Sequence, residues 1–102
     1  MERMLKRPDQ LIAQARQCLA FQDWKGCLKA CQMALFCEPK GDMFAAALYL
    51  KALSLSELGR RDEALKELGK VEDLGSLYPH FAAHAQRLKT EITKDLSKTG
   101  TN

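Results

Sequence analysis

The chain has 102 residues, of which 46% are hydrophobic and 28% are charged, and its formal net charge is +3. This length suits one domain, and this composition suits a folded chain rather than a disordered one. The small positive charge predicts no nucleic-acid partner, for which a basic stripe is expected. No apolar run approaches the roughly 18 residues of a membrane span, so we expect no membrane partner. Residues 1–10 lack the apolar segment of a secretory signal.

The cysteines indicate the compartment in which the protein works. All four of them lie within the first 37 residues, at Cys18, Cys27, Cys31 and Cys37. They fall in helical stripes of a chain rich in leucine and alanine, where reduced thiols pack as small apolar side chains. We therefore expect an intracellular reducing compartment, the cytoplasm or the nucleus, rather than a disulfide-bonded secreted protein.

The first half of the chain predicts two helices after a basic lead-in at residues 1–7. Pro8 and Asp9 are both favoured in the first turn of a helix. Asp23 is the expected N-cap of the second helix, and a segment containing proline and glycine follows that helix. The apolar residues that recur at helical spacing are Leu11, Ala15, Cys18 and Leu19, and then Cys27, Leu28, Cys31, Ala34 and Leu35.

The second half predicts a helical hairpin and a final helix. Gly59 can adopt the left-handed conformation that ends a helix, and Asp62 suits the cap or first turn of the next one. A break at 74–79 precedes the final helix, and residues 97–102 are expected to form a flexible tail. The three apolar stripes are Ala45, Leu48, Ala52 and Leu55; Ala64, Leu65, Leu68 and Val71; and Phe81, Ala85, Leu88 and Ile92.

The two predicted hairpins repeat each other. Ala15 and Ala52 are 37 residues apart, and so are Cys27 and Ala64, which stand at matching places in the second helix of each pair. Small side chains at these four places allow close helix packing. A repeat of this length built from paired helices is typical of an α-solenoid.

On these residues the chain resembles the tetratricopeptide repeat (TPR) family. The string LGRRDEAL at 58–65 is the most similar to that family, and Pro39 stands where the first unit closes. The resemblance implies an all-α solenoid of antiparallel hairpins with about five helices. Its parts are a TPR-like domain at 8–96, made of a first repeat at 8–41, a second repeat at 43–78 and a capping helix at 79–96.

The resemblance also implies a protein–protein interaction module, a scaffold or adaptor that binds a peptide or helix of a partner protein in a concave groove. The residues expected to face the groove are Asp9, Ile12, Arg16, Tyr49, Leu53, His80, Ala83 and Arg87. Aromatic, apolar and cationic side chains together suit a segment that contains an acidic residue. Alternatively, Tyr49 and Leu53 pack against neighbouring helices and the arginines are solvated. The family's clamp for chaperone C-terminal tails is not matched, so such tails are not expected as partners.

Other functions stay open from the sequence. Two hairpins are fewer than the roughly three repeats that solenoids usually need, so a self-associating homodimer is one alternative. The large side chains that two hairpins do not obviously cover are Phe21, Trp24, Phe36, Phe44 and Tyr78. An exposed cluster of these would be a partner surface. A regulatory domain appended to an enzyme, and a phosphopeptide reader that uses Arg16 and Arg87, are further alternatives.

The sequence contains no recognisable catalytic constellation. Cys27 and Cys31 lie four residues apart on one helix and could bind zinc with Cys18 and a histidine, but core packing is the preferred interpretation. His80 and His84 are also four apart, yet the FAA between them lacks the glutamate of a metalloprotease helix. The acids are expected on outer helix faces. We therefore predict neither an enzyme nor a metal or cofactor site.

Overall fold

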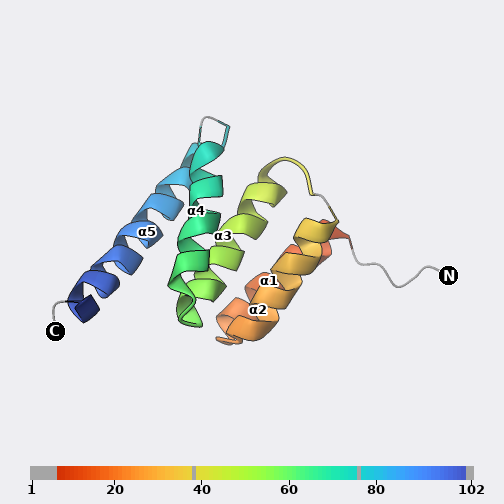
Figure 1. Ribbon diagram of the computed structural model, residues 1–102. Helices are drawn as coiled ribbons and strands as arrows, with labels where there is room; N and C mark the ends of the chain where they lie inside the picture. Colours follow the sequence, from red (N-terminus) through yellow and green to blue (C-terminus); the bar gives the residue numbers. More distant parts are fainter. Residues whose placement is uncertain (1–6, 38, 76, 101–102) are drawn as a thin grey trace.

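The computed structural model describes residues 7–37, 39–75 and 77–100, with side chains described up to residue 94. Within these ranges the chain is all-helical, with five α-helices and no strand, as predicted (Figure 1). The helices are α1 (Pro8–Ala20), α2 (Trp24–Phe36), α3 (Asp42–Glu57), α4 (Arg61–Asp73) and α5 (Pro79–Gly100). Most of the expected lead-in, residues 1–6, and residues 101–102 of the expected tail lie outside the described residues.

The helix ends follow local signals in the sequence. Asp23 caps α2, because its Oδ1 accepts a hydrogen bond of 3.0 Å from the backbone N–H of Gly26. Gly59 has a φ of +82° in the turn between α3 and α4, the left-handed conformation expected for it. Asp62 lies in the first turn of α4, whereas Arg60 is the N-cap residue. Helix α5 continues to Gly100, four residues beyond the predicted end, because no proline or glycine interrupts it.

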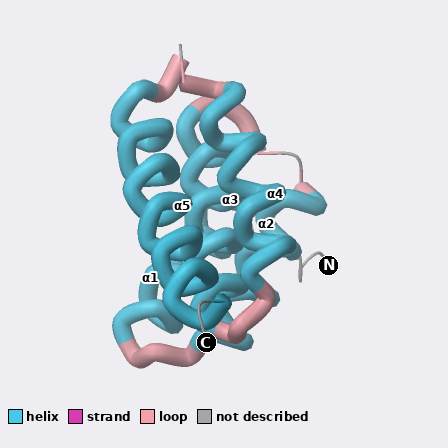
Figure 2. The backbone as a smooth tube through the Cα atoms, turned by 60° about the vertical axis from the view of Figure 1, so that its left-hand side comes forward, coloured by secondary structure: helices cyan, strands magenta, loops and turns pink. Residues whose placement is uncertain are grey.

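Each helix packs against the next one in the chain, and short turns make these neighbours antiparallel. In addition α1 contacts α3, and α3 contacts α5, whereas α2 and α4 share no contact in the described part of the chain. The odd-numbered helices therefore lie together on one side and run in the same direction (Figures 1 and 2). This arrangement makes α3 the central helix of the molecule.

Small side chains allow the helices to approach closely. Ala15 and Cys27 have no exposed surface and belong to a core between α1, α2 and the first half of α3. Ala52 and Ala64 are equally buried in a second core between α3, α4 and α5, to which Leu28 of α2 also belongs. The four positions singled out by the repeat are thus fully buried. Helix α3 contributes residues to both cores, and this explains its high alanine content.

One acid lies in the core rather than on an outer face, where the sequence predicted the acids. Glu67 of α4 is buried, and its Oε2 lies 3.5 Å from Nζ of Lys51 on α3 and 3.4 Å from Nζ of Lys70. Its Oε1 is buried without a hydrogen-bond partner. The prediction was wrong here because the rotation of α4 against α3, set by apolar packing, turns this position inward. The half-buried Lys51 supplies the neutralising charge.

Candidate partner-binding groove

A cleft of about 180 Å³ opens between the odd-numbered helices. Helices α1 and α3 form its two sides, and the first turn of α5 closes one part of it, as expected from the contacts of α3 with both neighbours. The lining residues are Asp9, Ile12, Ala13 and Arg16 from α1, Asp42, Met43 and Ala46 from α3, and Phe81 from α5.

The floor of the cleft is apolar and its rim is charged. Ile12 and Ala46 are almost fully buried in the first core, and Met43 and Phe81 pack against that core while keeping part of their surface exposed. The Phe81 ring also lies 4.3 Å, centroid to centroid, from the ring of the exposed His80. An apolar side chain inserted here would therefore contact the core directly.

The charges on the rim are separated along the helices. Asp9 and Asp42 both lie in the first turn of their helices, where the helix dipole favours a carboxylate. Arg16 is seven residues after Asp9, which places it about 10 Å further along α1. Asp9 pairs with the exposed Arg7 at 3.4 Å, a weak surface contact. Arg16 and Asp42 have no ion-pair partner among the described residues, so both are available to a ligand.

The same side of the molecule continues along α3 and α5 toward Tyr49. This residue follows Ala46 by one helical turn, and its half-buried ring lies 5.9 Å from that of His84. Burial raises the pKa of the Tyr49 hydroxyl, the charge of Glu91 raises it further, and Arg87 partly offsets both. Glu91 and Arg87 of α5 are therefore close enough to Tyr49 to act on its hydroxyl.

The structure brings some of the predicted groove residues together and separates others. Ile12 and Arg16 line the cleft, and His80 flanks it through its contact with Phe81. Beyond the cleft, Tyr49 and Arg87 form a neighbouring surface. Leu53 instead packs, half-buried, against the second core and does not line the cleft. Of the two other residues expected in the groove, Asp9 lines the cleft and Ala83 is exposed outside it.

Five lining residues were not predicted for the groove, namely Ala13, Asp42, Met43, Ala46 and Phe81. Phe81 was assigned to an apolar stripe of the last helix, and its ring does touch both cores while also reaching the cleft. Asp42 and Met43 follow the segment with proline and glycine that separates the two predicted hairpins. Their position opposite α1 depends on how two hairpins pack, which no local sequence pattern reports.

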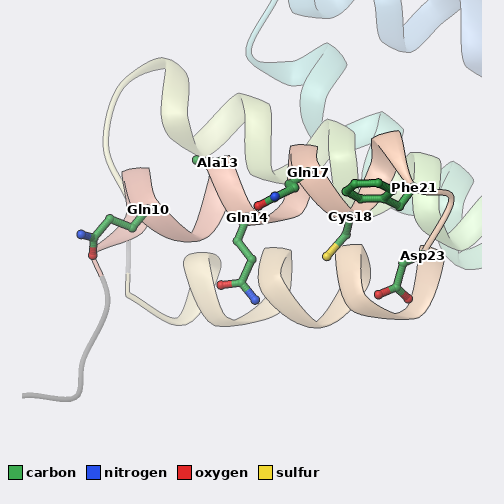
Figure 3. A pocket seen from close by; sticks show the side chains of 7 residues that line it. All are labelled: Gln10, Ala13, Gln14, Gln17, Cys18, Phe21 and Asp23. Carbon is green, nitrogen blue, oxygen red and sulfur yellow. The ribbon is translucent and has the colours of Figure 1, made fainter.

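A second concave surface lies along α1 and shares Ala13 with the cleft. This hollow measures about 800 Å³. In Figure 3, Phe21 and Asp23 lie at one end of it and Gln10 lies at the other. A hollow of about 750 Å³ between α1 and α2 adjoins it. The side chains of Phe21 and Phe36 are 76% and 88% exposed, as expected for uncovered aromatic residues. Trp24 and Tyr78 are half-buried, and Phe44 is 37% exposed.

Two of the four thiols, Cys27 and Cys31, lie in the first core. A hydrogen bond from Cys31 lowers the pKa of the Cys27 thiol to about 7 despite the opposing effect of burial, and the same contact and burial raise the pKa of Cys31. Burial and then Asp23 raise the pKa of Cys18. Cys27 and Cys31 have no exposed surface. The described residues contain no group of three or more His, Cys, Asp or Glu side chains that could bind a metal ion.

Comparisons with protein-family models, with curated proteins and with solved structures found no match for this chain. Among the described residues, no helix is both long and apolar enough to span a lipid bilayer.

Proposed function

We propose that the chain is a protein–protein interaction module of the TPR kind, which binds a segment of a partner protein in the cleft between α1, α3 and α5. The observation that carries the proposal is the cleft itself, with an apolar floor that reaches the core and charged residues on its rim. The order of helix contacts supports a solenoid of hairpins. In such a solenoid the first helices of successive pairs touch each other, as α1, α3 and α5 do.

The size of the cleft favours a protein segment over a small molecule. Pockets for drug-sized ligands measure about 300–1,000 Å³. A cleft of about 180 Å³ instead accommodates one large side chain, with the rest of the ligand lying across an open surface. The module acts by binding rather than by catalysis, and its free thiols suit a reducing compartment of the cell.

The positions of the charges define the partner segment. An apolar side chain enters between Ile12 and Phe81, an acidic residue pairs with Arg16, and a basic residue pairs with Asp42. Arg16 lies about 10 Å along α1 from Asp9, which corresponds to seven residues of a helical ligand or three of an extended one, and Asp42 lies in the first turn of the neighbouring α3. The segment therefore contains an apolar residue with an acidic residue on one side of it and a basic residue on the other.

The proposal is tested by selecting peptides from a random display library on the immobilised chain. We expect the selected peptides to contain the apolar residue flanked by opposite charges. With isotope-labelled protein, such a peptide should shift the amide resonances of α1, α3 and the start of α5. Arg16→Glu should weaken binding at least tenfold, because an attractive pair becomes repulsive.

The matched control is Lys66→Glu, which makes the same charge change at an exposed position on α4. It should leave peptide affinity within about twofold. Circular dichroism checks that both variants are folded. The proposal fails if the selected peptides shift amides elsewhere, or if Arg16→Glu and Lys66→Glu affect binding equally.

A further inference from the structure

The outer side of the first hairpin, which we call the end face, contains two hollows. Among the described residues, those that line them come from α1, α2, the turn between these helices and Cys37, and the hollows adjoin because both include Gln14, Cys18 and Asp23. Phe21 lies at one end, and Phe36 lies at the other with Met33, which is 48% exposed. Large apolar side chains gathered around connected hollows mark a surface that another protein covers.

The polar composition of the end face restricts what can cover it. Among the described residues that line the two hollows, Asp23 and Lys29 are the charged ones. Most of the other polar side chains are amides, namely Gln10, Gln14, Gln17 and Gln32. The charges of this described lining therefore cancel, although the whole chain has a net charge of +3. A strongly charged partner would find almost no ion-pair partners on it.

We infer that the end face binds the end face of a second copy of this chain, forming a two-fold symmetric dimer. In such a dimer each contact occurs twice, because the same patch is used by both copies. Amide side chains contain both donors and acceptors, so a surface of glutamines is complementary to itself. Asp23 and Lys29 have opposite charges and can pair reciprocally across the interface.

The dimensions of the end face predict a weak dimer. Helix α2 has 13 residues, so it is about 20 Å long, and two neighbouring helices are about 20 Å wide. The resulting flat area of about 400 Å² makes a small interface, and interfaces at the low end of the size range belong to weak complexes. We therefore expect a dissociation constant in the micromolar rather than the nanomolar range.

Light scattering across a concentration range from about 1 to 500 µM, which brackets that affinity, tests the inference. The mass should rise from the 11.5 kDa of one chain toward twice that value and stop there. Phe21→Lys and Phe36→Lys should each weaken the dimer at least tenfold. Phe21 directly follows α1, and Phe36 is the last residue of α2. A cation is favourable at the C-terminal end of a helix, so both substitutions are compatible with folding.

The control is Leu77→Lys, which makes a similar change at a 68% exposed leucine between α4 and α5. It should dimerise like the original chain. A mass of one chain at every concentration would overturn the inference. A dimer that both phenylalanine variants retain, or that Leu77→Lys abolishes, would place the contact on another face and overturn it as well. A mass that keeps rising beyond two chains would exclude a closed two-fold pair.

Discussion

Replacing Ala52 with leucine tests the close approach of α3 and α4, on which the placement of the groove helices depends. Ala52 has no exposed surface and lies in the same core as Ala64, which is equally buried. The added carbon atoms therefore have no free space to occupy. Overpacking of this kind costs typically about 1–3 kcal/mol of folding free energy. For a domain of about 100 residues this lowers the melting temperature by roughly 5–20 °C.

The matched control is Ala83→Leu on α5. Ala83 is exposed, and both alanines lie within helices, so the small change in helix propensity is common to the two variants. We expect the control to stay within about 0.5 kcal/mol of the original chain. Thermal unfolding followed by circular dichroism, at a concentration where all variants are monomeric, measures the difference. If the two variants melt at the same temperature, the close contact between α3 and α4 is refuted.

Three further predictions concern single residues. Gly59→Ala should destabilise the fold by about 1 kcal/mol, because the φ of Gly59 is +82°. Gly69→Ala should stabilise the fold by a similar amount, because Gly69 lies within α4 and an added Cβ there meets no other atom. Chemical denaturation measures both changes. Lys51→Met should cost about 1–3 kcal/mol in the same assay, since it leaves the buried Glu67 carboxylate with the exposed Lys70 alone. Of the four thiols only Cys37 is exposed, whereas Cys27 and Cys31 are buried. A thiol reagent should therefore modify Cys37 rapidly and should modify Cys27 and Cys31 only when the protein unfolds.

Each of these has a clear contrary result. Equal effects of the two glycine substitutions would mean that the backbone of the α3–α4 turn is not left-handed. An unchanged stability of Lys51→Met would mean that Glu67 is solvated. Rapid modification of Cys27 and Cys31 in the folded protein would mean that the first core is open to solvent.

The helices and their cores were predictable because their signals are local. Asp23 satisfies a backbone N–H three residues away, and Gly59 ends a helix through its own φ angle. The fully buried Ala15 and Ala52 were identified from a spacing within the sequence. Such features depend on neighbouring residues or on a repeat, and no knowledge of the tertiary packing is needed to find them.

The features that were missed depend on how distant elements pack. Glu67 resembles any surface acid of α4, and only its position opposite Lys51 shows that it is buried. Phe81 reaches the cleft because α5 packs against α3, which also contacts α1, almost 70 residues earlier in the chain. Arg16 could be predicted as a groove residue, but the presence of Asp42 on the same rim required the structure. The charge pattern expected of a partner follows from these two residues together.

The central claim is that the cleft recognises a partner segment through its charges, and a charge exchange tests this most directly. The measurement is the affinity of one selected peptide, and of its variant with lysine in place of the acidic residue, for the original chain and for Arg16→Glu. We predict that Arg16→Glu weakens the original peptide at least tenfold and that the lysine variant restores the loss. If the lysine peptide binds Arg16→Glu no better than the original peptide does, Arg16 does not contact that residue and the proposed mode of recognition is contradicted.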